Sequence, residues 1–307
     1  MPSTCLRDQG CAIVAASLTE LVTRDENPYV PINPDELAAD AIECAEAGAA
    51  IVHFHARNPD GSQAKTNDSL YREALELIAK ESDVLMWPTA MSLSASSDLS
   101  LKSGLPHVWA LDDHPPAGGR FRIAPFDVFR KGASPRLDPI TGRLATNHDI
   151  GEYDTWSPPE ALQEMLDRKL IPLIHCADVG EVRWAYHVTR EGIIPPPAFI
   201  QVQFFGAALL GPSPTIRNLD ACFAEWGGGD VEWLVAAQMM PSEQSLDALY
   251  DHALERGAGI RVGLGDSGTL YPGLRNVDHV EMAVKRLEKF GLSPATPSQL
   301  LSRLEGN

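Results

Sequence analysis

Eight short apolar runs, each followed by a longer stretch of helical period, constrain the fold of this chain more than any other feature. They are rich in Val, Ile and Ala, and they lie at residues 12–17, 49–55, 83–88, 107–112, 171–178, 198–205, 231–237 and 258–266. Runs that are apolar along their whole length are typical of parallel strands whose outer face is covered by helices. The count of eight predicts a TIM (β/α)8 barrel.

The stretches between the runs carry the start and stop signals of helices. Asn33 can cap a helix whose first position is Pro34, and Gly48 follows its last turn. The same period recurs in residues 67–82, 157–169, 241–258 and 276–291. The alternative fold is a doubly wound open sheet, which predicts a glycine-rich phosphate loop after the first strand. The first strand continues as "AIVAASLTELV", which has no glycine, so we favour the barrel.

One segment departs from the regular spacing. Residues 113–157 follow the fourth predicted strand, are rich in Pro, Gly and Arg, and show little period. Loops of this length in compact domains serve as lids or interface arms, or are disordered. We therefore expect one barrel domain over residues 1–307 with a long loop insert at about 113–157, suited to covering an anionic ligand.

Charge and cysteine usage exclude several classes of partner. The formal net charge of −17 argues against nucleic acid and against an anionic membrane surface, although a local arginine can still bind an anionic small molecule. The five cysteines are scattered and form no CxxC pair, which is typical of a reducing compartment. No apolar run approaches 18 residues and no signal-peptide pattern opens the chain, so we expect a cytoplasmic protein.

Polar side chains gather where the predicted strands end, which is the face that carries the chemistry of a TIM barrel. They are Glu20, His53, His55, Arg57, Thr89, Asp112, His175, Gln201, Gln203, Gln238, Arg261 and Asp266. Residues two apart on a strand point the same way, so His53 and His55 can hold one metal ion. A lone buried histidine is usually a hydrogen-bonded core residue, but two on one face at a strand end favour a metal site.

Arg261 alternates with Ile260 and Val262 and therefore points away from both. A buried arginine needs an anionic partner. Two interpretations remain open, and they are compatible. Arg261 can form an internal salt bridge with Asp266, or it can bind a substrate carboxylate and tune Asp266 as a base.

Two long segments resemble a known family. "NPYVPINPDELAADAIECAEAGAAIVHFHARNPDGS" is similar to the N-terminal signature of the β-keto acid cleavage enzymes, typified by 3-keto-5-aminohexanoate cleavage enzyme. "GAGIRVGLGDSGTLYPG" and the helix after it resemble the C-terminal signature of that family. The likeness spans nearly the whole chain apart from the insert.

The resemblance implies a barrel that holds a divalent metal, most often Zn²⁺, with acetyl-CoA as co-substrate. The family reaction converts a β-keto acid and acetyl-CoA into acetoacetate and a new acyl-CoA. The metal pair falls on His53 and His55, and the arginine and base fall on Arg261 and Asp266. We further expect Glu20 to take part in catalysis. The expected partners are a β-keto acid, a CoA ester and further copies of the chain in a tetramer or dimer.

For the substrate carboxylate we expect Thr89, Arg57 and Asp112 to contribute to binding. Two positions depart from the family pattern. Gly265 stands where the family has its third metal ligand, a glutamate, and His175 stands where it has a glutamate near the end of strand five. We expect His175 to replace the missing ligand; the alternative is a site of two histidines completed by water, Glu20 or Asp112.

The lost glutamate keeps two other functions open. The first is a metal-dependent hydrolase on the same barrel, which would not need acetyl-CoA. The second is a non-catalytic descendant, which would bind little or no metal.

Overall fold

The computed structural model describes residues 5–64, 67–90, 105–118, 121–128, 136–137, 144–145, 158–190, 192–209, 211–224, 226, 231–240 and 242–306. Eight parallel strands form one sheet within these residues, in the order β4-β3-β2-β11-β10-β9-β8-β5. Their bounds are β2 Val14–Ser17, β3 Ile51–Phe54, β4 Leu85–Pro88, β5 Ile123–Asp127, β8 Ile171–Cys176, β9 Ala198–Phe205, β10 Val231–Gln238 and β11 Gly259–Val262.

The sheet curls into a nearly closed barrel, as the sequence predicts. Its two end strands, β4 and β5, meet at a parallel bridge between Met86 and Phe121. Each of these strands contains a proline, Pro88 in β4 and Pro125 in β5. Proline has no N–H to donate and is confined to sheet edges. The incomplete hydrogen bonding at this seam follows from these two residues.

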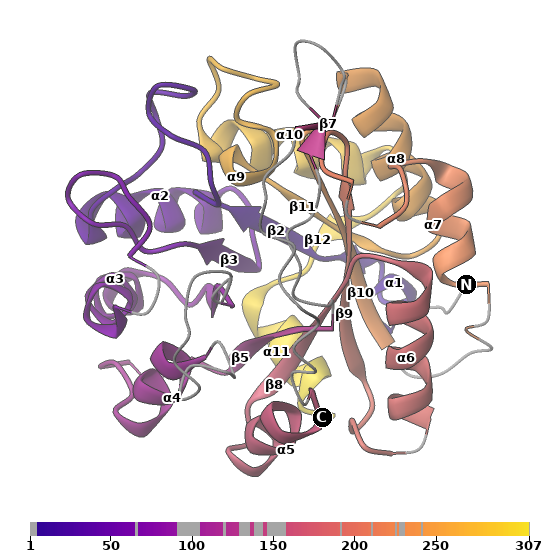
Figure 1. Cartoon of the computed structure of the whole chain (residues 1–307), viewed down its shortest axis with the longest axis horizontal. Helices are drawn as coiled ribbons and strands as arrows, with labels where there is room; N and C mark the ends of the chain where they lie inside the picture. Colours follow the sequence, from indigo (N-terminus) through magenta and orange to yellow (C-terminus); the bar gives the residue numbers. More distant parts are fainter. Residues whose placement is uncertain are drawn as a thin grey trace.

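Helices surround the barrel in Figure 1 and cover its outer face. Their bounds are α2 Pro34–Glu46, α3 Asp68–Glu81, α4 Pro106–Asp113, α5 Pro158–Asp167, α6 Val179–Arg190, α7 Ile216–Cys222, α8 Glu243–Glu255 and α10 Asn276–Glu288. The predicted cap is confirmed, because the Asn33 side chain accepts a hydrogen bond of 2.9 Å from the N–H of Glu36. None of the described helices is long and apolar enough to cross a membrane.

The fourth predicted strand is wrong. Residues 107–112 belong to helix α4, and the fourth barrel strand is β5, which lies inside the stretch predicted as an insert. A short apolar run is compatible with either a buried strand or a buried helix, and Pro106 supplies the helix start here. Of residues 129–157, the structure describes only two short strands, β6 (Arg136–Leu137) and β7 (Leu144–Ala145). The insert and its role as a cover therefore stay predictions.

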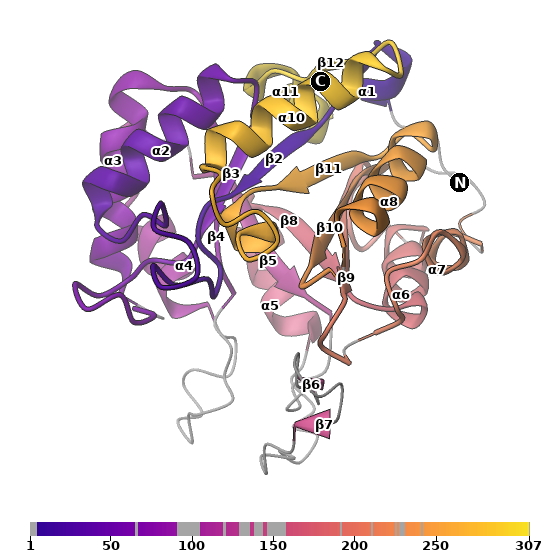
Figure 2. The same ribbon diagram turned by 90° about the horizontal axis from the view of Figure 1, so that it is seen from above.

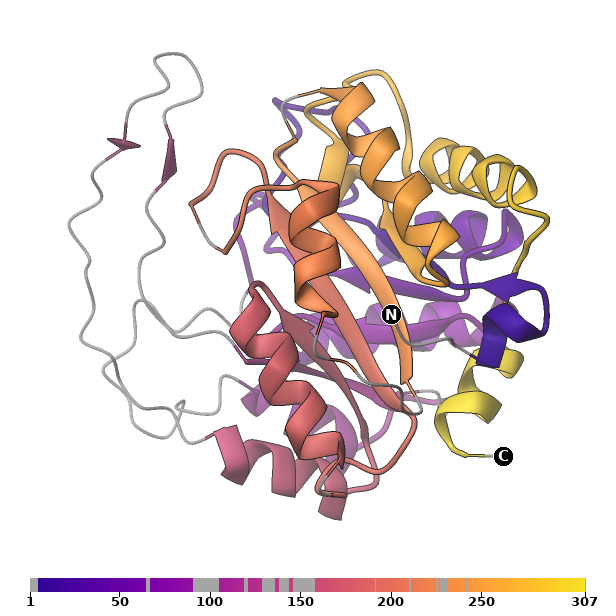
Figure 3. The same ribbon diagram turned by 90° about the vertical axis from the view of Figure 1, so that its right-hand side faces the viewer.

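The N-terminal end of the barrel is closed by both ends of the chain. Strand β1 (Cys11–Ala12) pairs with β12 (Ser293–Pro294), and helix α1 (Cys5–Asp8) lies beside α11 (Pro297–Leu304) in Figures 2 and 3. The apolar cluster inside the barrel joins these helices to the strands. It contains Leu6 and Leu300 together with Ile13, Ile51 and Phe199. The chemistry is therefore left to the C-terminal end.

Candidate metal centre and active site

Two neighbouring strands bring three ligand groups together at the C-terminal end of the barrel. His53 lies on β3 opposite Ser17 of β2, and His55 comes directly after β3 on the same face. Glu20 follows three residues after the end of β2. One ligand atom from each of Glu20, His53 and His55 lies within 4.8 Å of the other two.

The Glu20 carboxylate lies between the two imidazoles. Its Oε1 is 3.1 Å from Nε2 of His53, and its Oε2 is 2.9 Å from Nε2 of His55. The guanidinium of Arg261 is 3.1 Å from Oε1. The two rings meet edge to face, with centroids 5.3 Å apart. The carboxylate and both Nε2 atoms therefore converge on one point.

The other nitrogen of each imidazole has a partner that fixes the ring. Nδ1 of His53 is 3.0 Å from the carbonyl oxygen of Trp87, and Nδ1 of His55 is 3.0 Å from Oε1 of Gln63. The Gln63 amide also donates to the backbone oxygen of Glu20 at 2.7 Å. Such partners orient metal-binding histidines and raise their basicity.

Trp87 and Gln63 were missed in the sequence. The Trp87 ring stacks on His53 with centroids 4.4 Å apart, and it also lies 5.6 Å from the guanidinium of Arg261. Trp87 could have been found, because it is the register partner of His53 on the next strand. Gln63 lies in a loop and gives no comparable signal.

A second group adjoins the first through Arg261. Its Nε and one terminal nitrogen donate to the two carboxylate oxygens of Asp266 at 2.9 and 2.6 Å. The Gln238 amide donates to Oδ1 of Asp266 at 3.2 Å. Both open interpretations of Arg261 therefore gain support from one arrangement, in which the arginine joins Glu20 to Asp266.

Burial and charge shift these groups in opposite directions. Burial raises the pKa of Asp266 to about 6, although Arg261 opposes the shift. Burial also acts to raise the pKa of Glu20, but His55, Arg261 and His53 outweigh it and hold that pKa well below its ordinary value. Burial lowers the pKa of His53. Near neutral pH the pair therefore presents a charged Glu20 and a neutral His53, which are the forms that bind metal.

The loop that carries Glu20 is held by Arg57 rather than by ligand. The guanidinium of Arg57 donates to the carbonyl oxygens of Thr19, Glu20, Val22 and Gly61 at 2.7 to 3.3 Å. Arg57 was expected to bind substrate carboxylate, but these contacts make it a positioning residue. Glu20 itself has a φ of 42°, in the left-handed region that is costly for a residue with a side chain.

Gly265 leaves the space that Glu20 occupies. A Cβ atom at residue 265 would lie 2.3 Å from Oγ of Ser17 and 2.6 Å from Cγ of Glu20. The short helix α9 (Leu264–Ser267) thus passes directly against the Glu20 side chain. A glutamate at residue 265 and the present position of Glu20 exclude each other.

We expect Gly265→Ala to destabilise the protein by about 1–3 kcal/mol, because overpacking a buried contact forces neighbouring side chains to shift. Urea unfolding followed by circular dichroism would measure the change. Gly273→Ala is the matched control, since a Cβ there would meet nothing within 4 Å. Equal stability of the two variants would contradict the crowding at residue 265.

The remaining predicted residues lie apart from this cluster. His175 is on β8, where its Nδ1 is 3.1 Å from Oδ1 of Asp127, and it is not in the group formed by His53 and His55. The predicted role of Asp112 is wrong, because that residue lies on α4 and pairs with Arg168 at 3.0 Å. Its placement at the rim depended on the wrong fourth strand. Thr89 follows β4 at the rim, and its hydroxyl donates to the oxygen of Ala90 at 2.9 Å.

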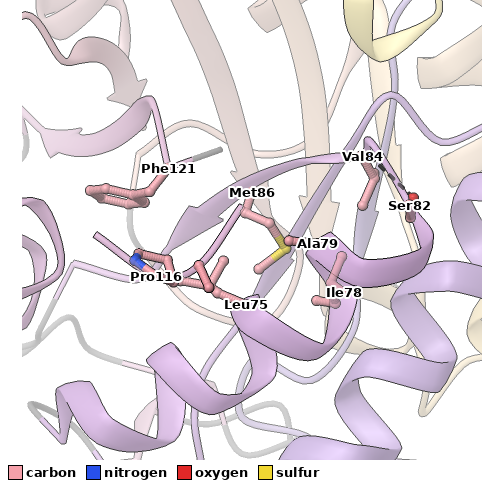
Figure 4. A pocket seen from close by; sticks show the side chains of 9 residues that line it. Leu75, Ile78, Ala79, Ser82, Val84, Met86, Pro116 and Phe121 are labelled. Atoms are coloured by element: carbon pink, nitrogen blue, oxygen red, sulfur yellow. Dashed lines mark hydrogen bonds between the residues drawn. The ribbon is translucent and has the colours of Figure 1, made fainter. Parts of the chain in front are cut away.

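A small apolar pocket lies between α3 and β4, away from the cluster (Figure 4). Leu75 and Ile78 line it from the helix, and Val84, Met86 and Phe121 line it from the sheet. Met86 is next to Trp87 on the strand and therefore points to the opposite face. The pocket is a packing gap outside the barrel and offers no titratable group.

Comparison with known proteins agrees with this architecture. A family model described as beta-keto acid cleavage enzyme matches residues 11–305. A 3-keto-5-aminohexanoate cleavage enzyme of Acetoanaerobium sticklandii is 34% identical, over 94% of this chain and 95% of that protein. A 3-dehydrocarnitine:acetyl-CoA trimethylamine transferase of Rhizobium meliloti is 27% identical, over 96% of this chain and 95% of that protein.

Among solved structures, a ternary complex of ObcA with a C4-CoA adduct and oxalate superposes with a TM-score of 0.64 at 15% identity. The match covers 91% of this chain and 68% of the ObcA chain, and it supports the barrel fold. The family model covers almost the entire sequence. The chain therefore belongs to the beta-keto acid cleavage enzyme family.

Proposed function

We propose that this enzyme exchanges acyl groups between a β-keto acid and acetyl-CoA, giving acetoacetate and a new acyl-CoA, at a divalent metal site formed by Glu20, His53 and His55. The observation that carries the proposal is the convergence of these three ligand atoms within 4.8 Å, beside the Arg261–Asp266 pair. The printed names of several relatives, such as the acetyl-CoA transferase of Rhizobium meliloti, support the reaction class.

The residues fit the proposed metal. Two imidazole nitrogens and one carboxylate, with room for a further ligand, are the donor set of many catalytic zinc sites. Both imidazoles have their Nδ1 atoms engaged, so Nε2 is the atom left for the ion. Bound there, Zn²⁺ would supply Lewis-acid polarisation of the keto oxygen of the substrate.

Glu20 replaces the family glutamate in this proposal. The resemblance puts that ligand at residue 265, and here the glycine at residue 265 makes room for the side chain of Glu20. The site therefore keeps one carboxylate and two imidazoles, but the carboxylate comes from the end of β2 instead of the end of β11. His175 is not needed as a ligand.

Asp266 is the proposed base, acting on the methyl group of acetyl-CoA or on an intermediate. Arg261 holds both of its oxygens, and Gln238 donates to one of them. A base works best when its pKa is near the working pH. The raised pKa of Asp266, about 6, suits that role better than the ordinary value of a surface aspartate.

We expect kcat/KM to rise with pH through about 6 in the wild type. Only the deprotonated carboxylate of Asp266 can accept a proton, and its pKa is raised to about 6, so activity is lost as pH falls through that value. The pH profile of acetoacetate formation measures this, with Asp266→Asn as the variant that lacks the titrating group. A wild-type profile that stays flat down to pH 4.5 would contradict the assignment.

The reaction itself is tested by mixing the zinc-loaded protein with a set of 3-oxo acids in the presence and absence of acetyl-CoA. Acetoacetate and a new acyl-CoA should form only when acetyl-CoA is present. Release of product from the acid without acetyl-CoA would favour the hydrolase instead. Size-exclusion chromatography of the same protein would test the predicted homo-oligomer.

A further inference from the structure

A wall of polar side chains lies inside the barrel on the strands that face the metal centre. Strand β9 contributes Gln201 and Gln203, each 1% exposed. The alternate residues Ile200, Val202 and Phe204 pack in the outer cluster with the helices, so the two glutamines point into the barrel. In the strand order, β11 and β10 separate β9 from β2, and the closing of the barrel sets the two faces opposite each other.

The two glutamines bond to each other and leave one polar atom each. Nε2 of Gln201 donates to Oε1 of Gln203 at 2.9 Å. Oε1 of Gln201 and Nε2 of Gln203 are buried and have no partner among the residues that the structure describes. Turning both amides over exchanges the roles of the residues but still leaves one donor and one acceptor. Buried polar atoms of this kind are normally satisfied, so the pair is prepared for a ligand group or water.

The neighbours of the pair make the wall nearly neutral. Gln201 is the register partner of His175, whose imidazole is already matched with the carboxylate of Asp127. Gln203 lies opposite Ala236 of β10, whose methyl side chain leaves space beside the amide. A ligand carboxylate could use only the free donor, and an ammonium group only the free acceptor. A hydroxyl or a carboxamide could use both.

We propose that Gln201 and Gln203 form the subsite for the distal end of the β-keto acid, and that this end carries an uncharged group that both donates and accepts hydrogen bonds. The inference rests on the proposed function, because it assigns the substrate class of the same site. Sites built to bond a polar group discriminate strongly against substrates that lack it, since their own polar atoms are then left unpaired.

The test compares four 3-oxo acids of equal chain length whose distal group is a methyl, a hydroxyl, a carboxamide or an ammonium. We expect the wild type to prefer the hydroxyl or carboxamide acid over the methyl acid by about tenfold or more in kcat/KM. In the Gln201→Leu/Gln203→Leu double variant this preference should disappear or reverse. Replacing both partners of a buried pair by apolar groups of similar size is nearly neutral for stability, so the variant should fold.

Phe199→Leu is the matched control, because Phe199 lies on the same strand and the same face, deeper in the barrel. It should keep the wild-type preference. A double-leucine variant that is destabilised but keeps the preference would give the glutamines a purely structural role and overturn the subsite. Turnover of all four acids with equal kcat/KM would also overturn it, while the proposed function would stand. Turnover of none would overturn both.

Discussion

Purified Glu20→Gln protein should carry less than about a tenth of the divalent metal that the wild type binds, and its acyl-exchange activity should fall in proportion. Glutamine has nearly the same size, but its neutral amide is a much weaker ligand than a carboxylate. Removing even an outer partner of a metal ligand costs about 10- to 100-fold in affinity, so loss of a direct ligand should cost at least that. Elemental mass spectrometry after dialysis against zinc gives the stoichiometry.

His175→Ala is the control that separates the two possible third ligands. His175 lies on β8 with Asp127 as its partner, so its loss should leave about one equivalent of metal in place. The opposite pattern, with metal retained in Glu20→Gln and lost in His175→Ala, would establish the three-histidine site and reject Glu20. Absence of metal from the wild type after the same dialysis would reject the metal site altogether and favour the non-catalytic descendant.

A transfer of the carboxylate tests the compensation directly. In Glu20→Gly/Gly265→Glu the new glutamate starts from a Cβ position 2.6 Å from the present Cγ of Glu20, so it grows into the vacated space. Glycine also relieves the positive φ of 42° at residue 20. We expect this double variant to bind metal again, unlike Glu20→Gln. Failure to recover metal would mean that residue 265 cannot supply a ligand in this chain.

The sequence was sufficient for most of the barrel, because seven of the eight apolar runs contain a strand of the sheet. The eighth, residues 107–112, failed because a short apolar run has no readable period and Pro106 starts a helix there. The true fourth strand contains Pro125 and lies in a proline-rich stretch. Only its place at the seam of the barrel, where a missing N–H is tolerated, makes that strand possible.

The candidate site was predictable where it follows from strand geometry. The spacing of His53 and His55 places them on one face, and the alternation around Arg261 turns its side chain inward to Asp266. The third ligand could not be predicted in the same way. Gly265 and Glu20 are far apart in the sequence, and the space that one leaves for the other exists only in the folded chain.

Arg261→Met should destabilise the protein by about 3–5 kcal/mol, the usual cost of removing one partner of a buried ion pair. Arg261 is 2% exposed and is the cation between Glu20 and Asp266, so its loss leaves two buried carboxylates without their common partner. Methionine keeps much of the side-chain volume, and the change therefore reports charge rather than a cavity. Denaturant unfolding at pH 7.5, on metal-free protein, measures the loss.

The same variant should be least stable at high pH. The pKa of Asp266 is already raised by burial to about 6, against a model value of 3.8, and without Arg261 it must rise further. A folded-state pKa above the unfolded value gives stability that is present below the unfolded pKa and lost as pH rises through the folded one. The gap between Arg261→Met and wild type should therefore widen from pH 5 to pH 8. Adding Asp266→Asn, which removes the titrating carboxylate, should flatten that dependence and restore part of the stability. A loss below about 1 kcal/mol at pH 7.5, unchanged by pH, would show that the arginine is not what holds the two carboxylates in place.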